Sequence, residues 1–227
     1  MNRTTFILVF ALACGFLAVC PEAHAQMTIV NPGFEDPVLV EDDWTWNDVP
    51  GWTLVNTDDA NGAGVWNTSS YDFDPPHAPE GQNVAYTETA WDGTVRGLSQ
   101  VLTETFEADT DYTLTVEVGN SWDYYWAGYS VQLLAGGTVL EEDNNSLWPD
   151  YYKWATSTVA YTYDAADAGL VGQPLEIRLL NLGKDMDAAT PSVVGVEFDN
   201  VRLIPEPASL SMLALAGLAL LRRRRRK

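Results

Sequence analysis

Apolar residues that alternate with polar ones recur through the middle of this chain, and they restrict the folds that it can adopt. At residues 112–118, 130–133 and 175–179, an apolar side chain occupies every second position. This period of two is typical of a half-buried β-strand, and no stretch of residues 26–204 shows a sustained helical period. The remaining predicted strands have similar apolar and aromatic content and lie at residues 28–30, 52–55, 83–88, 95–101, 156–163 and 193–203.

Turn signals separate these predicted strands. Asn61-Gly62, Asp92-Gly93 and Gly136-Gly137 fall between apolar runs, where tight reversals of the chain are expected. About 180 residues between the two ends suffice for one domain with its own core. The sequence therefore predicts an all-β fold, an antiparallel β-sandwich of the jelly-roll type.

The last predicted strand changes phase. Val196 and Phe198 point one way, whereas Val201 requires the opposite parity. An extra residue in a strand produces such a shift, so we expect a β-bulge near Asp199-Asn200. A bulge re-aims side chains, and here the re-aimed side chain carries a carboxylate.

Both ends of the chain resemble processing segments. Arg3 precedes an apolar run at residues 6–19, and Ala23-His24-Ala25 has the small-x-small pattern of a signal peptidase site. A signal peptide at residues 1–25 is therefore predicted. Both cysteines lie within it, so we expect neither a disulfide nor thiol chemistry in residues 26–204.

At the other end, Pro205-Glu206-Pro207 is followed by an uncharged run at residues 208–221 and a basic run at residues 222–227. Fourteen helical residues span about 21 Å, less than the roughly 30 Å of a bilayer core. The basic run orients such a helix with its end in the cytoplasm. An ordinary C-terminal anchor is the alternative.

The order of these three parts resembles the PEP-CTERM sorting signal, which in that family is processed by an exosortase. The resemblance implies residues 26–204 as the exported domain and residues 205–227 as the sorting signal. It further implies signal peptidase and exosortase as transient partners. The expected location is the cell envelope, the cell surface or the exterior, after transient anchoring in a membrane.

The predicted domain is strongly acidic. The chain has 32 acidic and 12 basic residues, and removing Glu22, Glu206 and the seven basic residues of the two ends leaves 30 against five, a net charge of −25. Such a domain repels nucleic acid and anionic lipid. Its expected partners are neutral polymers or cations, not nucleic acid.

A second resemblance rests on five short motifs, which are Asn31-Pro32-Gly33-Phe34-Glu35, Pro50-Gly51-Trp52, Gly81-Gln82-Asn83, Leu98-Ser99-Gln100 and the stretch from Phe198 to Leu203. In this order they resemble the carbohydrate-binding-module families with a galactose-binding-like jelly roll. The resemblance implies a structural Ca²⁺, with Glu35 and Asp199 as its side-chain ligands. Asn200 stands where the family often has a second aspartate, which lowers the charge of the implied site.

Several tryptophans lie among polar residues, where a sugar ring stacks on an aromatic face and flanking polar groups bind its hydroxyls. Trp122, Tyr124 and Trp126 have the spacing of one strand face and are predicted to form a binding platform. Trp91, Trp148 and Tyr151 are second choices. The alternative for each of these residues is a place in the core, which is also the expectation for Trp52.

No catalytic motif stands out. His77 lies in a proline-rich loop without a nucleophile beside it. The sequence therefore favours a non-catalytic exported protein of the cell surface or extracellular matrix that binds carbohydrate such as exopolysaccharide. The alternatives are a structural envelope or biofilm component without a small ligand, and a small polysaccharide hydrolase with two carboxylates in one cleft.

Overall fold

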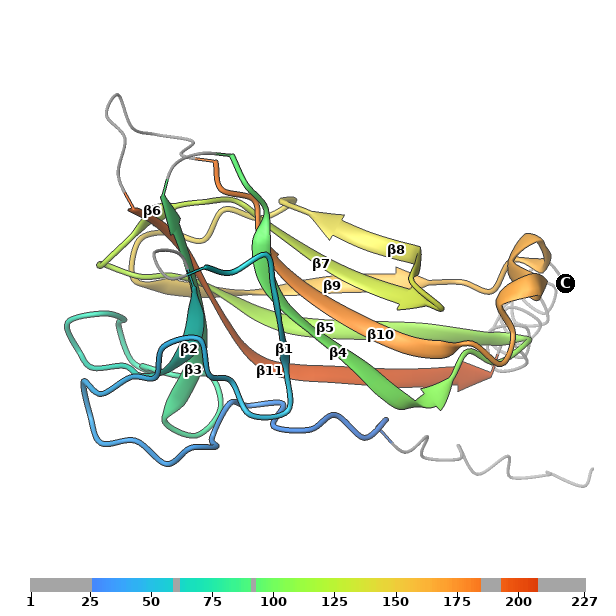
Figure 1. Cartoon of the computed structure of the whole chain (residues 1–227), viewed down its shortest axis with the longest axis horizontal. Helices are drawn as coiled ribbons and strands as arrows, with labels where there is room; N and C mark the ends of the chain where they lie inside the picture. The colour runs from blue at the N-terminus through green and yellow to red at the C-terminus, as the bar shows by residue number, and fades with distance from the viewer. Residues whose placement is uncertain (1–25, 59–61, 91–92, 185–192, 208–227) are drawn as a thin grey trace, which may run out of the picture.

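Two facing antiparallel sheets form the domain (Figure 1). The structure is a computed structural model that describes residues 26–58, 62–90, 93–184 and 193–207. One sheet has the strand order β1 (Thr53–Val55), β4 (Arg96–Thr105), β10 (Pro174–Asn181), β7 (Tyr129–Ala135) and β8 (Thr138–Asn144). The predicted all-β sandwich is therefore confirmed.

The second sheet has a long central strand. Its order is β2 (Ala63–Asn67), β3 (Asn83–Ala90), β11 (Val193–Pro207), β5 (Thr110–Asn120) and β9 (Lys153–Tyr161). The short strand β6 (Tyr125–Trp126) pairs with β11 in parallel. A 3-10 helix, η1 (Ala165–Leu170), connects β9 to β10.

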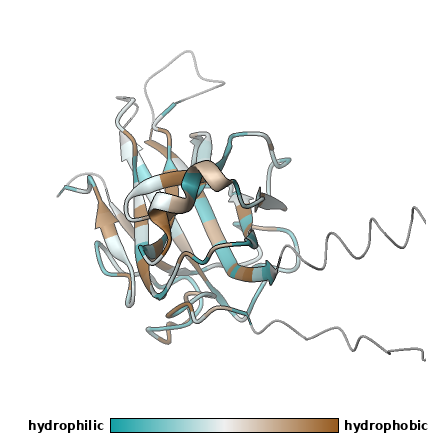
Figure 2. Cartoon of the chain, turned by 90° about the vertical axis from the view of Figure 1, so that its right-hand side faces the viewer, coloured by the Kyte–Doolittle hydropathy of each residue, from teal (hydrophilic) through white to brown (hydrophobic). Residues whose placement is uncertain are grey.

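The core lies between the two sheets because each strand buries alternate side chains. In β5, Leu114, Val116 and Val118 are fully buried, whereas the residues between them are only partly buried. Hydrophobic and hydrophilic residues alternate along the strands in the same way (Figure 2). Phe198 of β11 and Trp52 also belong to this core, as expected for Trp52.

Three strands were not predicted, and one predicted strand does not form. β2 is buried along its whole length, so it shows no alternation, and β8 is largely exposed and polar. β6 has only two residues. Residues 28–30 form no strand, although the amide of Met27 donates to the carbonyl of Leu203 at 2.9 Å.

The predicted bulge in the last strand is confirmed. The pairing of β11 with β5 shifts register between Asp199 and Arg202, and Asn200 has a φ of 53°. Asparagine tolerates this left-handed backbone better than most residues. The amide of Val201 donates to the carbonyl of Pro32 at 2.9 Å, so the opening segment lies beside the last strand.

Pro205-Glu206-Pro207 continues β11 and pairs with residues 110–112 of β5. The strand therefore extends three residues past the predicted boundary at residue 204. The predicted signal peptide and the predicted helix at residues 208–221 lie outside the described residues. Within the described ranges, no helix is long and apolar enough to cross a membrane.

Candidate active site

A pocket of about 370 Å³ lies on the outer face of the six-stranded sheet, away from the core. Aromatic and acidic residues line it, and they come from β2, β3 and three loops: Asp42, Trp44, Trp46, Trp66, Asp72, Tyr86, Glu88, Asp123 and Tyr124. None of these lining residues is basic. The pocket thus combines flat apolar surfaces with negative charge.

Strand register builds the floor of this pocket. Gly64 of β2 pairs with Tyr86 of β3, and Tyr86 pairs with Glu197 of β11, so the three residues form one row across the sheet. A Cβ atom on Gly64 would lie 2.7 Å from Cε1 of Tyr86. The glycine is therefore required for the tyrosine ring to lie against β2.

The next row of the sheet carries Glu88 beside Gly195 of β11. The ring of Tyr124 covers Gly195, because a Cβ atom there would lie 2.5 Å from Cγ of Tyr124. Tyr124 and Glu88 share a side-chain hydrogen bond, in which the phenol is the donor. Gly195 thus allows Tyr124 to reach the carboxylate of Glu88.

The loop that carries Trp44 and Trp46 is fastened to the sheet. The amide of Asp42 donates to the carbonyl of Asn67 at 2.9 Å, and that of Thr45 donates to the carbonyl of Val65 at 2.8 Å. The hydroxyl of Tyr86 donates to the carbonyl of Thr45 at 2.5 Å. These contacts keep both tryptophans over the pocket.

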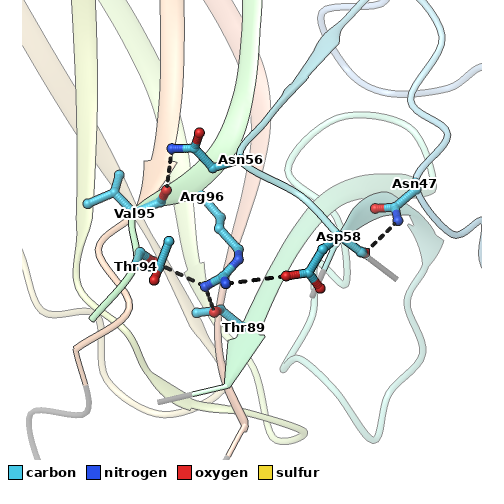
Figure 3. A network of polar contacts seen from close by, with 7 residues as sticks. All are labelled: Asn47, Asn56, Asp58, Thr89, Thr94, Val95 and Arg96. Atoms are coloured by element: carbon cyan, nitrogen blue, oxygen red, sulfur yellow. Dashed lines mark hydrogen bonds and ion pairs between the residues drawn. The ribbon is translucent and has the colours of Figure 1, made fainter. Parts of the chain in front are cut away.

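A polar network extends this attachment to the other sheet (Figure 3). The side-chain amide of Asn47 donates to the carbonyl of Asp58 at 3.0 Å, and the carboxylate of Asp58 lies 3.6 Å from the guanidinium of Arg96 on β4. Arg96 also donates to the hydroxyl of Thr89 on β3. The wall of the pocket is therefore connected to both sheets.

Burial alters the acidity of the pocket's carboxyl groups. It raises the pKa of Glu88, and the hydrogen bond from Tyr124 opposes that effect. Burial also raises the pKa of Asp123, and the negative charges of Asp72 and Asp42 add to the shift.

A further carboxyl group, that of Glu197, is fully buried beneath the lining. Burial raises its pKa to about 8, even though the hydroxyl of Ser121 donates to its carboxyl at 2.7 Å. The site thus holds carboxylic acids that keep their protons more tightly than exposed ones do.

The six aromatic residues predicted to bind ligand do not form one group. Tyr124 lines the pocket, and Trp126 lies in the core with 4% of its surface exposed. Trp122 and Tyr151 are exposed and contact each other edge to face, with ring centroids 5.7 Å apart. Trp148 stacks on Trp126, and Trp91 lies outside the described residues. Trp122 and Trp126 therefore do not share a platform.

The acidic lining and Tyr86 were missed by sequence reasoning. Tyr86 and Glu88 flank Thr87 in β3, where polar positions normally face solvent, so neither residue was expected to line a pocket. Asp72 and Asp123 lie in loops far apart in the sequence. The sequence signal that could have identified these residues is a tyrosine and a glutamate on the same face of one strand. This signal does not specify which loop covers that face.

The two predicted calcium ligands lie near one another. The carboxylate of Glu35 accepts from the amides of Gln82 and Asn83 at 2.9 and 2.8 Å, and that of Asp199 accepts from the amide of Glu80 at 2.7 Å. Among the residues that the structure describes, no three acidic, histidine or cysteine side chains are placed to hold a metal.

The model of one protein family, described as HpiC1 cyclase (HpiC1-like), matches residues 25–204. No sequence among the curated proteins matches the chain. A crystal structure of an apo cyclase from Fischerella sp. is 34% identical, with a TM-score of 0.71, and the match covers 82% of this chain and 98% of that one.

Two related structures contain small indole compounds. The Stig cyclase Fisc from Fischerella sp. TAU, in complex with (3Z)-3-(1-methyl-2-pyrrolidinylidene)-3H-indole, is 35% identical with a TM-score of 0.72 over 82% of this chain and 100% of that one. A cyclase from Fischerella sp. TAU in complex with 4-(1H-indol-3-yl)butan-2-one is 35% identical with a TM-score of 0.70, over 81% and 98% of the two chains.

These matches correct the functional predictions. The prediction of a non-catalytic carbohydrate-binding protein is wrong, because the matching family is one of cyclases and the similar solved structures are cyclases. The prediction that the chain is not an enzyme is wrong for the same reason. The predicted ligand was a polysaccharide, whereas the ligands found in similar structures are small indole compounds. Nothing found supports the PEP-CTERM identification or an exosortase partner, and the match over residues 25–204 gives another assignment. The chain belongs to the HpiC1-like cyclase family.

Proposed function

We propose that this protein is a cyclase that binds a small indole-bearing substrate in the aromatic and acidic pocket and promotes ring closure by proton transfer. The observation that carries the proposal is the position of Glu88, an acid of raised pKa in the lining of an aromatic pocket. The indole compounds held by related cyclases support this class of substrate. Stacking on tryptophan and tyrosine faces suits a planar indole.

The proposed reaction is an isomerisation without any oxidant or reductant. The carboxyl group of Glu88 donates its proton to an unsaturated carbon of the substrate side chain, which leaves a carbocation. A carbon of the indole ring attacks that cation and forms the new C–C bond. Loss of the ring proton to a carboxylate then restores the aromatic ring and returns the proton to the enzyme.

The same lining stabilises the intermediate charge. Tryptophan and tyrosine faces attract a cation through their ring quadrupoles. The carboxylates of Asp42, Asp72 and Asp123 add negative charge around the pocket. Fixed groups aimed at the developing charge lower the barrier because they need no reorganisation during the reaction.

The pH dependence of cyclisation tests this assignment with an indole that carries an alkenyl chain at C3. Because the protonated form of Glu88 is the active one, kcat/KM is expected to be constant at low pH and to fall above the raised pKa. Tyr124→Phe removes the hydrogen bond that lowers this pKa, so the fall moves to higher pH. Absence of ring-closed product by NMR contradicts the function, and an unchanged midpoint in Tyr124→Phe contradicts the role of Glu88.

We also propose that a structural Ca²⁺ binds where the opening segment meets β11, with Glu35 and Asp199 as ligands. Asp199 is fully buried, and burial and the charges of Glu80 and Glu35 raise its pKa, while amide donors oppose this. One buried carboxylate with two exposed carboxylates close to it is suited to a hard cation. Backbone carbonyls and water supply the other ligands that Ca²⁺ requires.

Calcium is therefore expected to raise the melting temperature. At 100 times the dissociation constant, a ligand that binds only the folded state stabilises it by about 2.7 kcal/mol. Thermal unfolding with and without CaCl₂ measures the shift, which Asp199→Asn should abolish and the exposed control Asp150→Asn should retain. An equal shift in both variants, or none in the native protein, contradicts the proposed site.

A further inference from the structure

We propose that the substrate of this pocket carries a protonated amine in addition to its aromatic ring. This inference rests on the proposed function, and it specifies the chemical class of the substrate. The lining combines several tryptophan side chains at the mouth with several carboxylates beside them. Binding of a neutral aromatic compound requires the tryptophans but not the carboxylates.

The aromatic residues are placed to surround a cation. Trp44 and Trp46 are 62% and 40% exposed, whereas Trp66 and Tyr86 are buried at the base of the pocket. Trp44 and Trp66 form an isolated β-bridge, so the exposed indole is held next to the buried one. Tryptophan gives the strongest cation–π attraction of the aromatic side chains. One exposed and one buried indole therefore supply both a stacking surface and a site for an ammonium group.

The acidic residues repel one another in the absence of a cation. Asp42, Asp72 and Asp123 all line the pocket. Burial raises the pKa of Asp123, and the charges of Asp72 and Asp42 add to that shift. None of the residues lining the pocket is basic, so no side chain there balances this charge. A bound ammonium group relieves the repulsion. A neutral substrate leaves it in place.

Asp72 and Asp42 have different local roles. One carboxylate oxygen of Asp72 accepts from the amide and the hydroxyl of Ser69, at 2.7 and 2.9 Å, so Asp72 also stabilises its own loop. Asp42 is exposed, and its backbone has a φ of +66°. Asparagine adopts this conformation readily. Asp42→Asn therefore removes one charge from the pocket without disturbing the loop.

The net charge of the chain also favours a cationic substrate. At −20 for the whole chain, the protein attracts cations and repels anions over the distance of a Debye length. A cationic indole amine is thus concentrated near the pocket before it binds. An indole carboxylate is repelled.

Calorimetric titration of the full chain with tryptamine and tryptophol tests the proposal. The two probes share the indole and the two-carbon chain. Tryptamine ends in an ammonium group and tryptophol in a hydroxyl group. We expect tryptamine to bind at least ten-fold more tightly, with a preference that decreases as salt is raised. In Asp42→Asn the preference should decrease at least three-fold while tryptophol affinity stays unchanged, and Glu141→Gln, an exposed change on β8, should behave as native.

The outcomes separate the two proposals. Equal affinities for tryptamine and tryptophol overturn the amine preference and leave the indole site of the proposed function in place. Binding of neither probe overturns both. A preference that Asp42→Asn does not reduce, or that Glu141→Gln reduces equally, contradicts the placement of the ammonium group in this pocket.

Discussion

Replacing Glu88 by glutamine is expected to lower kcat/KM for cyclisation at least 100-fold. General acid catalysis by a positioned side chain contributes about 10²- to 10⁴-fold, and an amide cannot donate a proton to carbon. Glutamine retains the shape of the side chain and an oxygen that accepts the hydrogen bond from Tyr124. Binding of the indole substrate should therefore change little, so the loss is expected in kcat.

Two controls accompany this variant. Glu141→Gln makes the same chemical change at an exposed position on β8, and it should leave kcat/KM unaltered. The melting temperature of Glu88→Gln should remain near that of the native protein, which excludes misfolding as the cause. Near-native activity in a folded Glu88→Gln variant would falsify the assignment of Glu88 as the proton donor.

Replacing Asp143 by alanine should lower the free energy of unfolding by about 3 kcal/mol, because it leaves two buried donors without an acceptor. The carboxylate of Asp143 accepts from the hydroxyls of Tyr129 and Ser157, both at 2.6 Å, and from the amide of Ser146 at 3.1 Å. Tyr129 and Ser157 are fully buried. Through these contacts Asp143 joins β8, β7 and β9.

The stabilisation by Asp143 should depend on pH in a defined direction. Burial alone would raise the pKa of Asp143, but the hydrogen bonds from Ser157, Tyr129 and Ser146 outweigh it and lower the pKa. The contribution is therefore fully present above the usual carboxyl value of 3.8 and is lost as the pH falls through the lowered folded-state pKa. Urea unfolding at pH 7 and pH 3 measures this difference.

Glu141→Ala is the matched control, since Glu141 lies on the same strand with its side chain exposed. Surface substitutions of this kind usually change stability by less than about 0.5 kcal/mol. If Asp143→Ala proves no less stable than Glu141→Ala at pH 7, the buried network does not stabilise the fold as described.

The strands could be predicted wherever one face is buried and the other is exposed. β5 and β10 alternate because the core covers only one side of each, and the bulge at Asn200 was visible as a change of parity. β2 could not be found in this way. The loop with Trp44 and Trp46 covers its outer face, so every residue of the strand is buried and the alternation disappears.

The pocket could not be predicted because its residues come from segments far apart in the chain. Trp122 and Trp126 have similar sequence contexts, yet one is 54% exposed and the other 4%. A carboxylate at a polar position of a strand is expected to face solvent, whereas burial in the folded protein raises the pKa of Glu88. Carbohydrate binding was predicted because aromatic and acidic residues together suit a sugar on an open surface as well as an indole in a pocket.

The sequence by itself determined the two-sheet sandwich, the parity of most strands and the acidic character of the domain, because these depend on local alternation and on composition. The tertiary structure decided which carboxyl groups are buried and which tryptophans face one another. Those properties depend on the loops that pack over the outer face of β2, β3 and β11. Desolvation and close approach of charges arise only when distant segments meet, so the chemistry of the pocket follows from the fold rather than from any one motif.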